Sequence, residues 1–157
     1  MIDLDDYDRR ILATLQRDGR MTVVALSDAV ALSPSQCARR LQRLEVAGAI
    51  RGYGAFIDPT VVGLDITALV TVTLDKQTGA NIKAFRALVE SRAEIVECLA
   101  LTGDGDYQLR IVARDLPSFS RFLLDVVIPT PGIATTRSHI VLDQVKSATA
   151  LPITPGT

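Results

Sequence analysis

Several residue types are scarce in this sequence of 157 residues, and each scarcity excludes a class of protein. The two cysteines, Cys37 and Cys98, lie far apart without Cys-x-x-Cys spacing, which argues against a disulfide scaffold or a zinc site. His139 is the only histidine, and neither thiol has the context of a Cys-His pair, so nucleophilic catalysis has no basis. The phosphate-binding pattern GxxxxGKS/T is also missing. We therefore expect no enzyme, no metal site and no cofactor.

Long apolar runs are missing as well, although 48% of the residues are hydrophobic. Charged residues interrupt every apolar stretch before it reaches the roughly 18 to 20 residues that a membrane-spanning helix needs. The first ten residues, MIDLDDYDRR, contain four aspartates and no apolar segment, unlike a secretory signal. We expect a globular, cytoplasmic protein with no membrane partner.

Positive charge is concentrated in the first third of the chain. The net charge of the whole chain is −1, but residues 9–57 hold eight arginines against three acidic residues, a net charge of +5. Such a local excess suits the binding of nucleic-acid phosphates, because each neutralised phosphate releases condensed counterions. A solvated helical face would have the same composition, so charge alone leaves both interpretations open.

Apolar residues at helical spacing predict two helices within the first 30 residues. The first covers residues 5–17, begins in an acidic turn and ends at Asp18-Gly19. The second covers residues 22–30, with Thr22 as its N-cap. The residues expected to face inward from this second helix are Val23, Leu26, Ala29 and Val30.

A third helix has start and stop signals at both ends. In Ser33-Pro34-Ser35-Gln36, serine suits the N-cap, proline the first helical position and glutamine the third position of a capping box. The helix runs to about Ala47, where Gly48 suits the left-handed residue beyond its end. A short helix, a tight link and a capped helix in this order are typical of a helix-turn-helix.

The outward face of this third helix is polar, basic and rich in amides. Cys37, Leu41 and Leu44 share one face at 100° per residue, and the opposite face carries Ser35, Gln36, Arg39, Gln42 and Arg43. Arginine suits guanine and glutamine suits adenine in the major groove of double-stranded DNA, and both also reach phosphates. A solvated surface helix is the alternative. The predicted DNA-binding residues are Thr22, Ser33, Ser35, Gln36, Arg39, Arg40, Arg43 and Arg51.

The segment from Ile50 to Pro59 combines glycines with alternating apolar residues. It predicts a small hairpin, or a strand leading out, that would give the helix-turn-helix a wing. After Asp58-Pro59 the helical period changes to a strand period, which marks a domain boundary. We predict a helix-turn-helix domain over residues 1–50, a hairpin or linker over 51–64 and a second domain over 65–157.

The second domain has the order βαββαβ, a ferredoxin-like arrangement that makes the whole chain α+β. The expected strands are 65–74, 95–101, 107–113 and 133–145, with helices over 81–89 and from Asp115 to about Pro129. Two helices cover one face of such a sheet. The face expected to remain open carries Thr71, Val112, Ile140 and Leu142. A second copy of the chain is the simplest partner that could cover this face, so we predict a homodimer.

Motifs throughout the chain carry a resemblance to one family. They are LDDYDRRIL from Leu4, LQRDGR from Leu15, LSPS from Leu32, RRL from Arg39, RLE from Arg43, GAIRGY from Gly48, TGDxDY from Thr102 and the tail from Val145 to Pro152. Through them the chain resembles the Lrp/AsnC transcriptional regulators. The resemblance implies a DNA-binding helix-turn-helix and a ligand module related to amino-acid-binding ACT domains. It also implies dimers, often in rings of four, and control by a small effector, usually an amino acid.

In the family that this chain resembles, the effector lies between dimers near a loop of the type Gly-Asp-x-Asp-Tyr. Here that loop is Gly103 to Tyr107, and Gly105 stands where the family often has an aromatic residue. An aspartate could accept the effector's ammonium group, and backbone N–H groups of the turn could donate to its carboxylate. The alternative is a turn whose aspartates bond only their own backbone. The predicted effector-binding residues are Leu101, Thr102, Gly103, Asp104, Asp106, Thr135, Thr136 and Ser138.

Two other functions deserve comparison with this one. The close pair Asp104 and Asp106 suggests calcium, but in an EF-hand count from Asp104 the sixth position is Leu109 instead of glycine. The other alternative is an amino-acid-binding module that acts through protein contacts without DNA, because fold alone does not decide function. We favour a sequence-specific DNA-binding regulator whose assembly or DNA affinity is tuned by a small effector.

Overall fold

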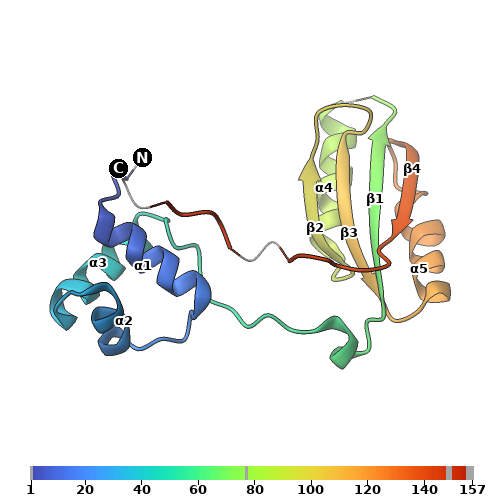
Figure 1. Ribbon diagram of the computed structural model, residues 1–157. Coiled ribbons are helices and arrows are strands. Elements are labelled where there is room, and N and C mark those ends of the chain that lie inside the picture. The colour runs from blue at the N-terminus through green and yellow to red at the C-terminus, as the bar shows by residue number, and fades with distance from the viewer. Residues whose placement is uncertain (1, 77, 148–149, 155–157) are drawn as a thin grey trace. The chain divides into compact units, whose positions relative to one another are not determined.

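The computed structural model describes residues 2–76, 78–147 and 150–154 (Figure 1). Contacts divide them into a unit that extends to Phe56 and includes the C-terminal segment from Lys146, and a unit over residues 57–145. We call these the head unit and the sheet unit. The head unit thus extends past the predicted boundary at residue 50 and takes in a segment that we had assigned to the second domain. Among the described residues, no helix is both long enough and apolar enough to cross a membrane.

The head unit contains the three predicted helices, α1 (Asp6–Arg17), α2 (Val23–Val30) and α3 (Pro34–Val46). Each begins at a side-chain cap. The carboxylate of Asp5 accepts a hydrogen bond from the N–H of Asp8 at 2.9 Å, and Thr22 and Ser33 cap α2 and α3 as predicted. Gly48 has φ of 71° just beyond α3, which confirms the predicted left-handed stop.

A small apolar core holds these helices together. Its buried residues are Ile11, Leu26, Val30, Cys37 and Leu44. The expectation that Ala29 faces inward is wrong, because Ala29 is exposed and Ser27 is buried instead. The hydroxyl of Ser27 donates to the carbonyl of Val24 at 2.7 Å, so its burial leaves no unsatisfied polar group.

The hairpin predicted over Ile50–Pro59 is wrong, because residues 51–58 form no strand. A strand needs a second strand to complete its backbone hydrogen bonds, and the described part of the head unit contains none. The segment is instead anchored to α3, where the hydroxyl of Tyr53 donates to Glu45 at 2.9 Å. Burial and this carboxylate raise the pKa of Tyr53 to about 12.

The side chain of Gln16, on α1, binds the C-terminal segment. The amide of Gln16 accepts from the N–H of Leu151 at 2.6 Å and donates to the carbonyl of the same residue at 3.2 Å. Both bonds are made to backbone atoms of Leu151, so they do not depend on the side chain of that residue. They explain why this part of the chain belongs to the head unit.

The sheet unit begins with a 3-10 helix (Pro59–Val62) that was not predicted, and then has the predicted order of elements. They are β1 (Ile66–Leu74), α4 (Gly79–Ser91), β2 (Ile95–Ala100), β3 (Tyr107–Ala113), α5 (Leu116–Phe122), which continues as a π-helical turn (Leu123–Val127), and β4 (Ile133–Ile140). All strand pairs are antiparallel, in the spatial order β2-β3-β1-β4. This confirms the ferredoxin-like βαββαβ arrangement.

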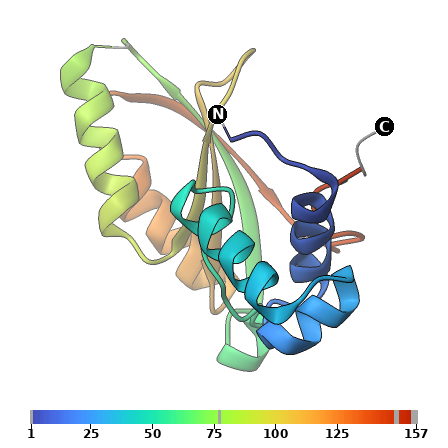
Figure 2. The ribbon, with the colours of Figure 1, turned by 90° about the vertical axis from the view of Figure 1, so that its left-hand side faces the viewer.

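Helices α4 and α5 cover the same face of this sheet (Figures 1 and 2). The ring of Phe85, on α4, packs against Tyr107 of β3 with 4.5 Å between ring centroids. The buried core is entirely apolar and consists of Ala68, Val70, Val72, Leu74, Phe85, Ile95, Leu109, Ile111, Ala113, Phe119, Phe122 and Val127.

The opposite face of the sheet is open, but its composition differs from the prediction. Thr71 alternates with the buried Val70 and Val72, so it lies on the open face as expected. Ile140 does not, because it lies opposite Ala68, whose side chain is buried on the helix side. Residues opposite each other in an antiparallel pair share a face.

The last strand is also shorter than predicted, ending at Ile140 instead of Val145. Among the strands of the described residues it pairs with β1 alone, and β1 begins at Ile66. The N–H of Val141 still donates to Thr67 at 2.9 Å, but β1 offers little further backbone to pair with. Leu142 therefore lies beyond the strand and is 96% exposed.

Candidate DNA-binding interface and effector loop

The outward face of α3 is exposed as predicted. Ser35, Gln36, Arg39, Gln42 and Arg43 are all exposed, while Cys37 and Leu44 are buried. The helical period alone explains this division.

Three of the predicted DNA-binding side chains act as helix caps. The hydroxyl of Thr22 accepts from Ala25 at 3.2 Å, and that of Ser33 accepts from Gln36 at 3.3 Å. The amide oxygen of Gln36 accepts in return from the N–H of Ser33 at 3.4 Å, which leaves its NH₂ group directed elsewhere. These residues thereby define where α2 and α3 begin.

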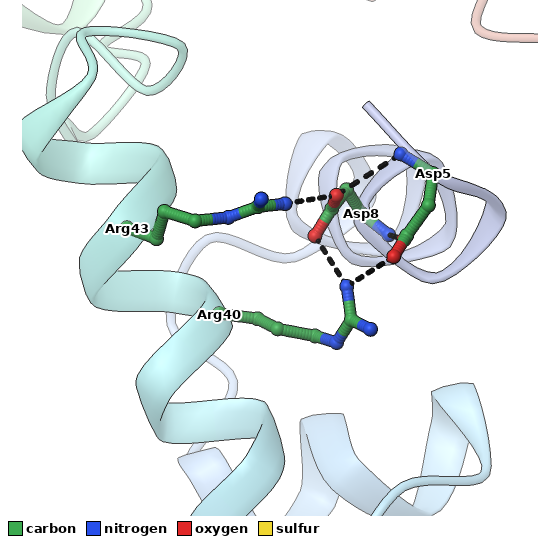
Figure 3. A network of polar contacts seen from close by, with 4 residues as sticks. All are labelled: Asp5, Asp8, Arg40 and Arg43. Carbon is green, nitrogen blue, oxygen red and sulfur yellow. Dashed lines mark hydrogen bonds and ion pairs between the residues drawn. The ribbon is translucent and has the colours of Figure 1, made fainter. Parts of the chain in front are cut away.

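Arg40 and Arg43 reach from α3 to the start of α1, where both bind the carboxylate of Asp8 (Figure 3). Arg40 lies 2.9 Å from one oxygen and Arg43 pairs with the other. The Asp8 side chain is completely buried, whereas those of Arg40 and Arg43 are 23% and 49% exposed. Sequence reasoning identified both arginines but missed Asp8, which is 32 and 35 residues away along the chain.

A second carboxylate and a ring complete the surroundings of Arg40. Its Nη1 lies 2.6 Å from Asp5, and its guanidinium lies over the ring of Tyr7 at 5.4 Å from the centroid. The hydrogen bond from the Asp8 backbone, followed by the contacts with Arg40, lowers the pKa of Asp5. The hydrogen bond with Asp5 raises the pKa of Arg40. Both partners are therefore charged at neutral pH.

Arg39 differs from its two neighbours. It is exposed and has no hydrogen bond or ion pair within the described chain. Together with Asp5, Arg40 and Arg43 it lines a cavity of about 260 Å³. Arg51 is also exposed, just after α3. The surface of α3 thus offers one unpaired arginine beside two that are held in place.

The predicted effector loop connects β2 to β3. Thr102, Gly103 and Asp104 are exposed at its tip, and the N–H of Leu101 donates to the carbonyl of Asp106 at 2.9 Å across its base. Asp106 also binds the neighbouring strand β1. Its carboxylate accepts from the N–H of Leu74 at 2.7 Å, and its own N–H donates to Val72 at 3.0 Å. Of the two predicted aspartates, Asp104 is therefore the one at the surface.

Gly105 is buried in this loop against Thr71 of β1. A Cβ atom at position 105 would lie 2.3 Å from the methyl carbon of Thr71, closer than any real contact. Glycine is therefore required here by a close approach of two chain segments. Because glycine stands here in place of the aromatic residue that the family often has, the loop packs closely against the open face of the sheet.

The hydroxyl residues predicted on β4 do not share a face. Thr135 lies opposite Thr73 on the open face, whereas Thr136 and Ser138 lie opposite Val72 and Val70 on the helix side. In addition, strand β1 lies between β4 and β3 in the sheet, and the loop leads into β3. The predicted effector residues thus fall into two groups on opposite sides of β1.

A larger cavity, of about 650 Å³, lies over the open face at the other end of β1. Thr67, Arg110 and Val112 of the sheet line it, together with the segments 57–65 and 141–144. Arg110 is paired across the strands with Glu97 at 3.2 Å. Sequence reasoning missed this cavity, because segments from both ends of the unit line it, one of them containing the 3-10 helix Pro59–Val62.

The architecture defines a class of protein, a helix-turn-helix DNA-binding protein with a separate ligand-binding sheet domain. Family models agree: the AsnC-type helix-turn-helix domain matches residues 4–45, and the Lrp/AsnC ligand binding domain matches residues 67–151. The chain belongs to the Lrp/AsnC family of transcriptional regulators. It is a DNA-binding regulator tuned by a small ligand, as predicted, and the alternative of a module without DNA binding is set aside.

Relatives match over nearly the whole chain. The leucine-responsive regulatory protein of Rhizobium meliloti is 38% identical over 152 residues, which is 97% of each protein. That of Escherichia coli K12 is 36% identical over 151 residues, 96% of this chain and 92% of the relative. A solved structure of a Neisseria meningitidis transcriptional regulator in complex with L-Met is 41% identical, with a TM-score of 0.91 over 96% of this chain and 97% of that one.

Proposed function

We propose that this regulator binds duplex DNA through the outward face of α3 and that an amino acid bound to the sheet unit controls its assembly or DNA affinity. The observation that carries the first part is Arg39 at the middle of that face, which is exposed and has no partner among the described residues. An arginine with all five N–H donors available suits the bidentate recognition of guanine in the major groove.

The eight predicted DNA-binding residues divide by role in this proposal. Arg39 and Ser35 face bases, and the NH₂ group of Gln36 is available beside them. Arg40, Arg43 and Arg51 meet phosphates, which position the protein without reading sequence. Thr22 and Ser33 present the N-termini of α2 and α3, whose dipoles also favour phosphate.

The effector site of this proposal requires more than one copy of the chain. Asp104 and the N–H groups of the loop around Gly103 supply partners for an ammonium and a carboxylate group. The hydroxyls of Thr135, Thr136 and Ser138 lie beyond β1. In this proposal the two groups contact the ligand from different copies of the chain. The L-Met in the Neisseria relative supports an amino acid as the ligand.

The open face of the sheet supports a homodimer as the basic unit. Val96 is 54% exposed there, and the adjoining segments expose Ile57, Val62 and Leu142. A second copy would bury this apolar surface around the 650 Å³ cavity. Such a dimer would place two α3 helices in successive major grooves, about 34 Å apart.

Replacing Arg39 tests the DNA contact. The variant Arg39→Gln should lose about 1 to 3 kcal/mol of operator affinity and relax the preference for operator over random duplex. Arg86→Gln removes the same charge from an exposed position on α4 and should leave affinity unchanged. Undiminished operator binding by Arg39→Gln at every salt concentration would overturn the assignment of α3.

A screen of the twenty amino acids tests the effector. A ligand that binds only the native state must raise its melting temperature, so at least one amino acid should do so and should change sedimentation or operator affinity. The variant Asp104→Asn should weaken that response. Identical melting temperature, sedimentation and affinity with all twenty would exclude control by an amino acid.

A further inference from the structure

The buried carboxylate of Asp8 organises the basic surface of α3. Each of its two oxygens binds a different arginine, Arg40 at 2.9 Å and Arg43 at the other oxygen (Figure 3). The second oxygen also accepts the N–H of Asp5 at 3.1 Å. One completely buried acid therefore determines where two partly exposed guanidinium groups lie.

Both guanidinium groups keep donors for a ligand. A guanidinium has five N–H groups, and the bonds to carboxylates use only Nη1 of Arg40 and Nη2 of Arg43. Both side chains line the cavity of about 260 Å³, and the unpaired Arg39 lines it as well. Three arginines therefore converge on one small space at the surface of α3.

We propose that Asp8 is a positioning residue for DNA binding, which holds Arg40 and Arg43 around this cavity so that they receive one phosphate of the duplex backbone beside the base-facing Arg39. The proposal rests on duplex binding through α3, as proposed above. It assigns to an acidic residue the effect of strengthening the binding of a polyanion.

The chemistry of the cavity favours a phosphate over a base. Planar guanidinium groups bind phosphate oxygens with paired hydrogen bonds, and the two guanidinium groups that Asp8 holds, those of Arg40 and Arg43, line the same cavity. Asp5 also lines the cavity, but Arg40 neutralises it at 2.6 Å. Three arginines against Asp5 and Asp8 leave a net positive charge. Arginines already held in place lose less conformational freedom on binding than mobile ones.

The proposal and simple electrostatics predict opposite changes in DNA affinity for the variant Asp8→Asn. Asp8→Asn removes a negative charge, so charge alone predicts tighter DNA binding. If Asp8 acts by placing Arg40 and Arg43, the same variant binds more weakly. We expect duplex affinity to fall about tenfold, and the salt dependence to lose about one phosphate contact. Asp3→Asn is the matched control, because Asp3 is exposed and its substitution changes the charge equally.

Fluorescence anisotropy with an operator duplex at several salt concentrations measures these affinities. Circular dichroism melts identify a temperature at which every variant is folded. If Asp8→Asn binds as tightly as Asp3→Asn, or more tightly, the proposal is overturned. If Arg39→Gln weakens binding and Asp8→Asn does not, the positioning role fails while duplex binding through α3 stands. If neither weakens it, the interface itself is wrong.

A double-mutant cycle separates positioning from general support of the fold. If Asp8 acts through Arg40 and Arg43, the loss caused by Asp8→Asn should become smaller in an Arg43→Gln background, where only the placement of Arg40 can still be lost. An equal loss in both backgrounds would contradict the proposal.

Arg43→Lys provides a second route in case Asp8→Asn fails to fold. Lysine keeps the charge and can still bind Asp8, but it lacks the planar fork of donors. We expect several-fold weaker binding. Full affinity in Arg43→Lys would overturn the phosphate site.

Discussion

The two units of this protein are stabilised by different forces. The sheet unit buries twelve residues in its core, all of them apolar. The head unit buries five apolar residues in its core, and it also buries the charged side chain of Asp8 and the hydroxyl residues Thr14 and Ser27. The head unit therefore depends more on ion pairs, whereas the sheet unit depends more on apolar burial. Changes of salt, pH and side-chain volume should affect the two units differently.

Loss of side-chain volume in the core of the sheet unit should cause the largest loss of stability. Phe85 is completely buried, so Phe85→Ala should lower the free energy of unfolding of the sheet unit by about 3 to 5 kcal/mol. Urea unfolding combined with amide hydrogen exchange separates the units. Phe56→Ala, at a residue that is 83% exposed, should change stability by no more than about 0.5 kcal/mol. Equal loss of protection in head and sheet amides would show that the units do not have separate cores.

A methyl group added in the effector loop should cause the second largest loss of stability. Gly105→Ala should cost about 1 to 3 kcal/mol, because the new carbon overlaps the methyl group of Thr71. Thr71→Ser removes that methyl group, so the cost of Gly105→Ala should fall sharply in the Thr71→Ser background. Urea unfolding of the four proteins in this cycle measures the coupling. Gly54→Ala, where no atom lies within 4 Å, is the control, and a full cost in both backgrounds would refute the contact.

Loss of a helix cap should weaken the head unit to a smaller extent. Ser33→Ala leaves the first N–H groups of α3 without their side-chain acceptor and should cost about 0.5 to 2 kcal/mol. Thermal unfolding, with hydrogen exchange of α3 amides, measures this. Ser35→Ala lies two residues further along and should have little effect, since alanine is a good helix former. The cap has no importance if the two variants are equally stable.

The smallest effect on stability should come from protonation of Asp5 at acidic pH. Because the pKa of Asp5 in the folded protein lies below its ordinary value of 3.8, its stabilising contribution is present above that pH. It is lost as the pH falls through the lowered folded pKa. Melts of the wild type and Asp5→Asn over an acid series should therefore converge at low pH. Asp115, which caps α5 and whose pKa is lowered by Ser118, should show the same behaviour for the sheet unit. Parallel profiles at all pH values would contradict both assignments.

The elements that sequence predicted well are those with local signals. The starts of α2 and α3 follow from Thr22 and Ser33, whose partners are three residues away. The alternation over Ile66–Leu74 likewise identified β1. By contrast, the hairpin near Ile50 and the length of β4 were wrong, because a strand exists only where another strand pairs with it. That partner cannot be read from the residues of the segment itself.

The candidate DNA-binding site was predicted in composition more than in arrangement. Helical spacing placed Arg39 and Arg43 on an exposed face, which the structure confirms. Helical spacing did not reveal that Arg43 and Arg40 share one buried carboxylate on another helix. A buried, paired aspartate and an exposed one look the same in a sequence, since the distinction depends on which side chains surround it.

The sequence by itself determined the local structure of this protein: where helices begin and end, which residues alternate along strands, and that positive charge gathers on α3. Each of these properties depends on neighbours within about four residues along the chain. Only the tertiary structure decided that Asp8 holds two of the arginines, that Gln16 fastens Leu151, and that Thr71 leaves no room at Gly105. These contacts join residues more than 30 positions apart, and they form because packing brings their elements within hydrogen-bonding or van der Waals distance.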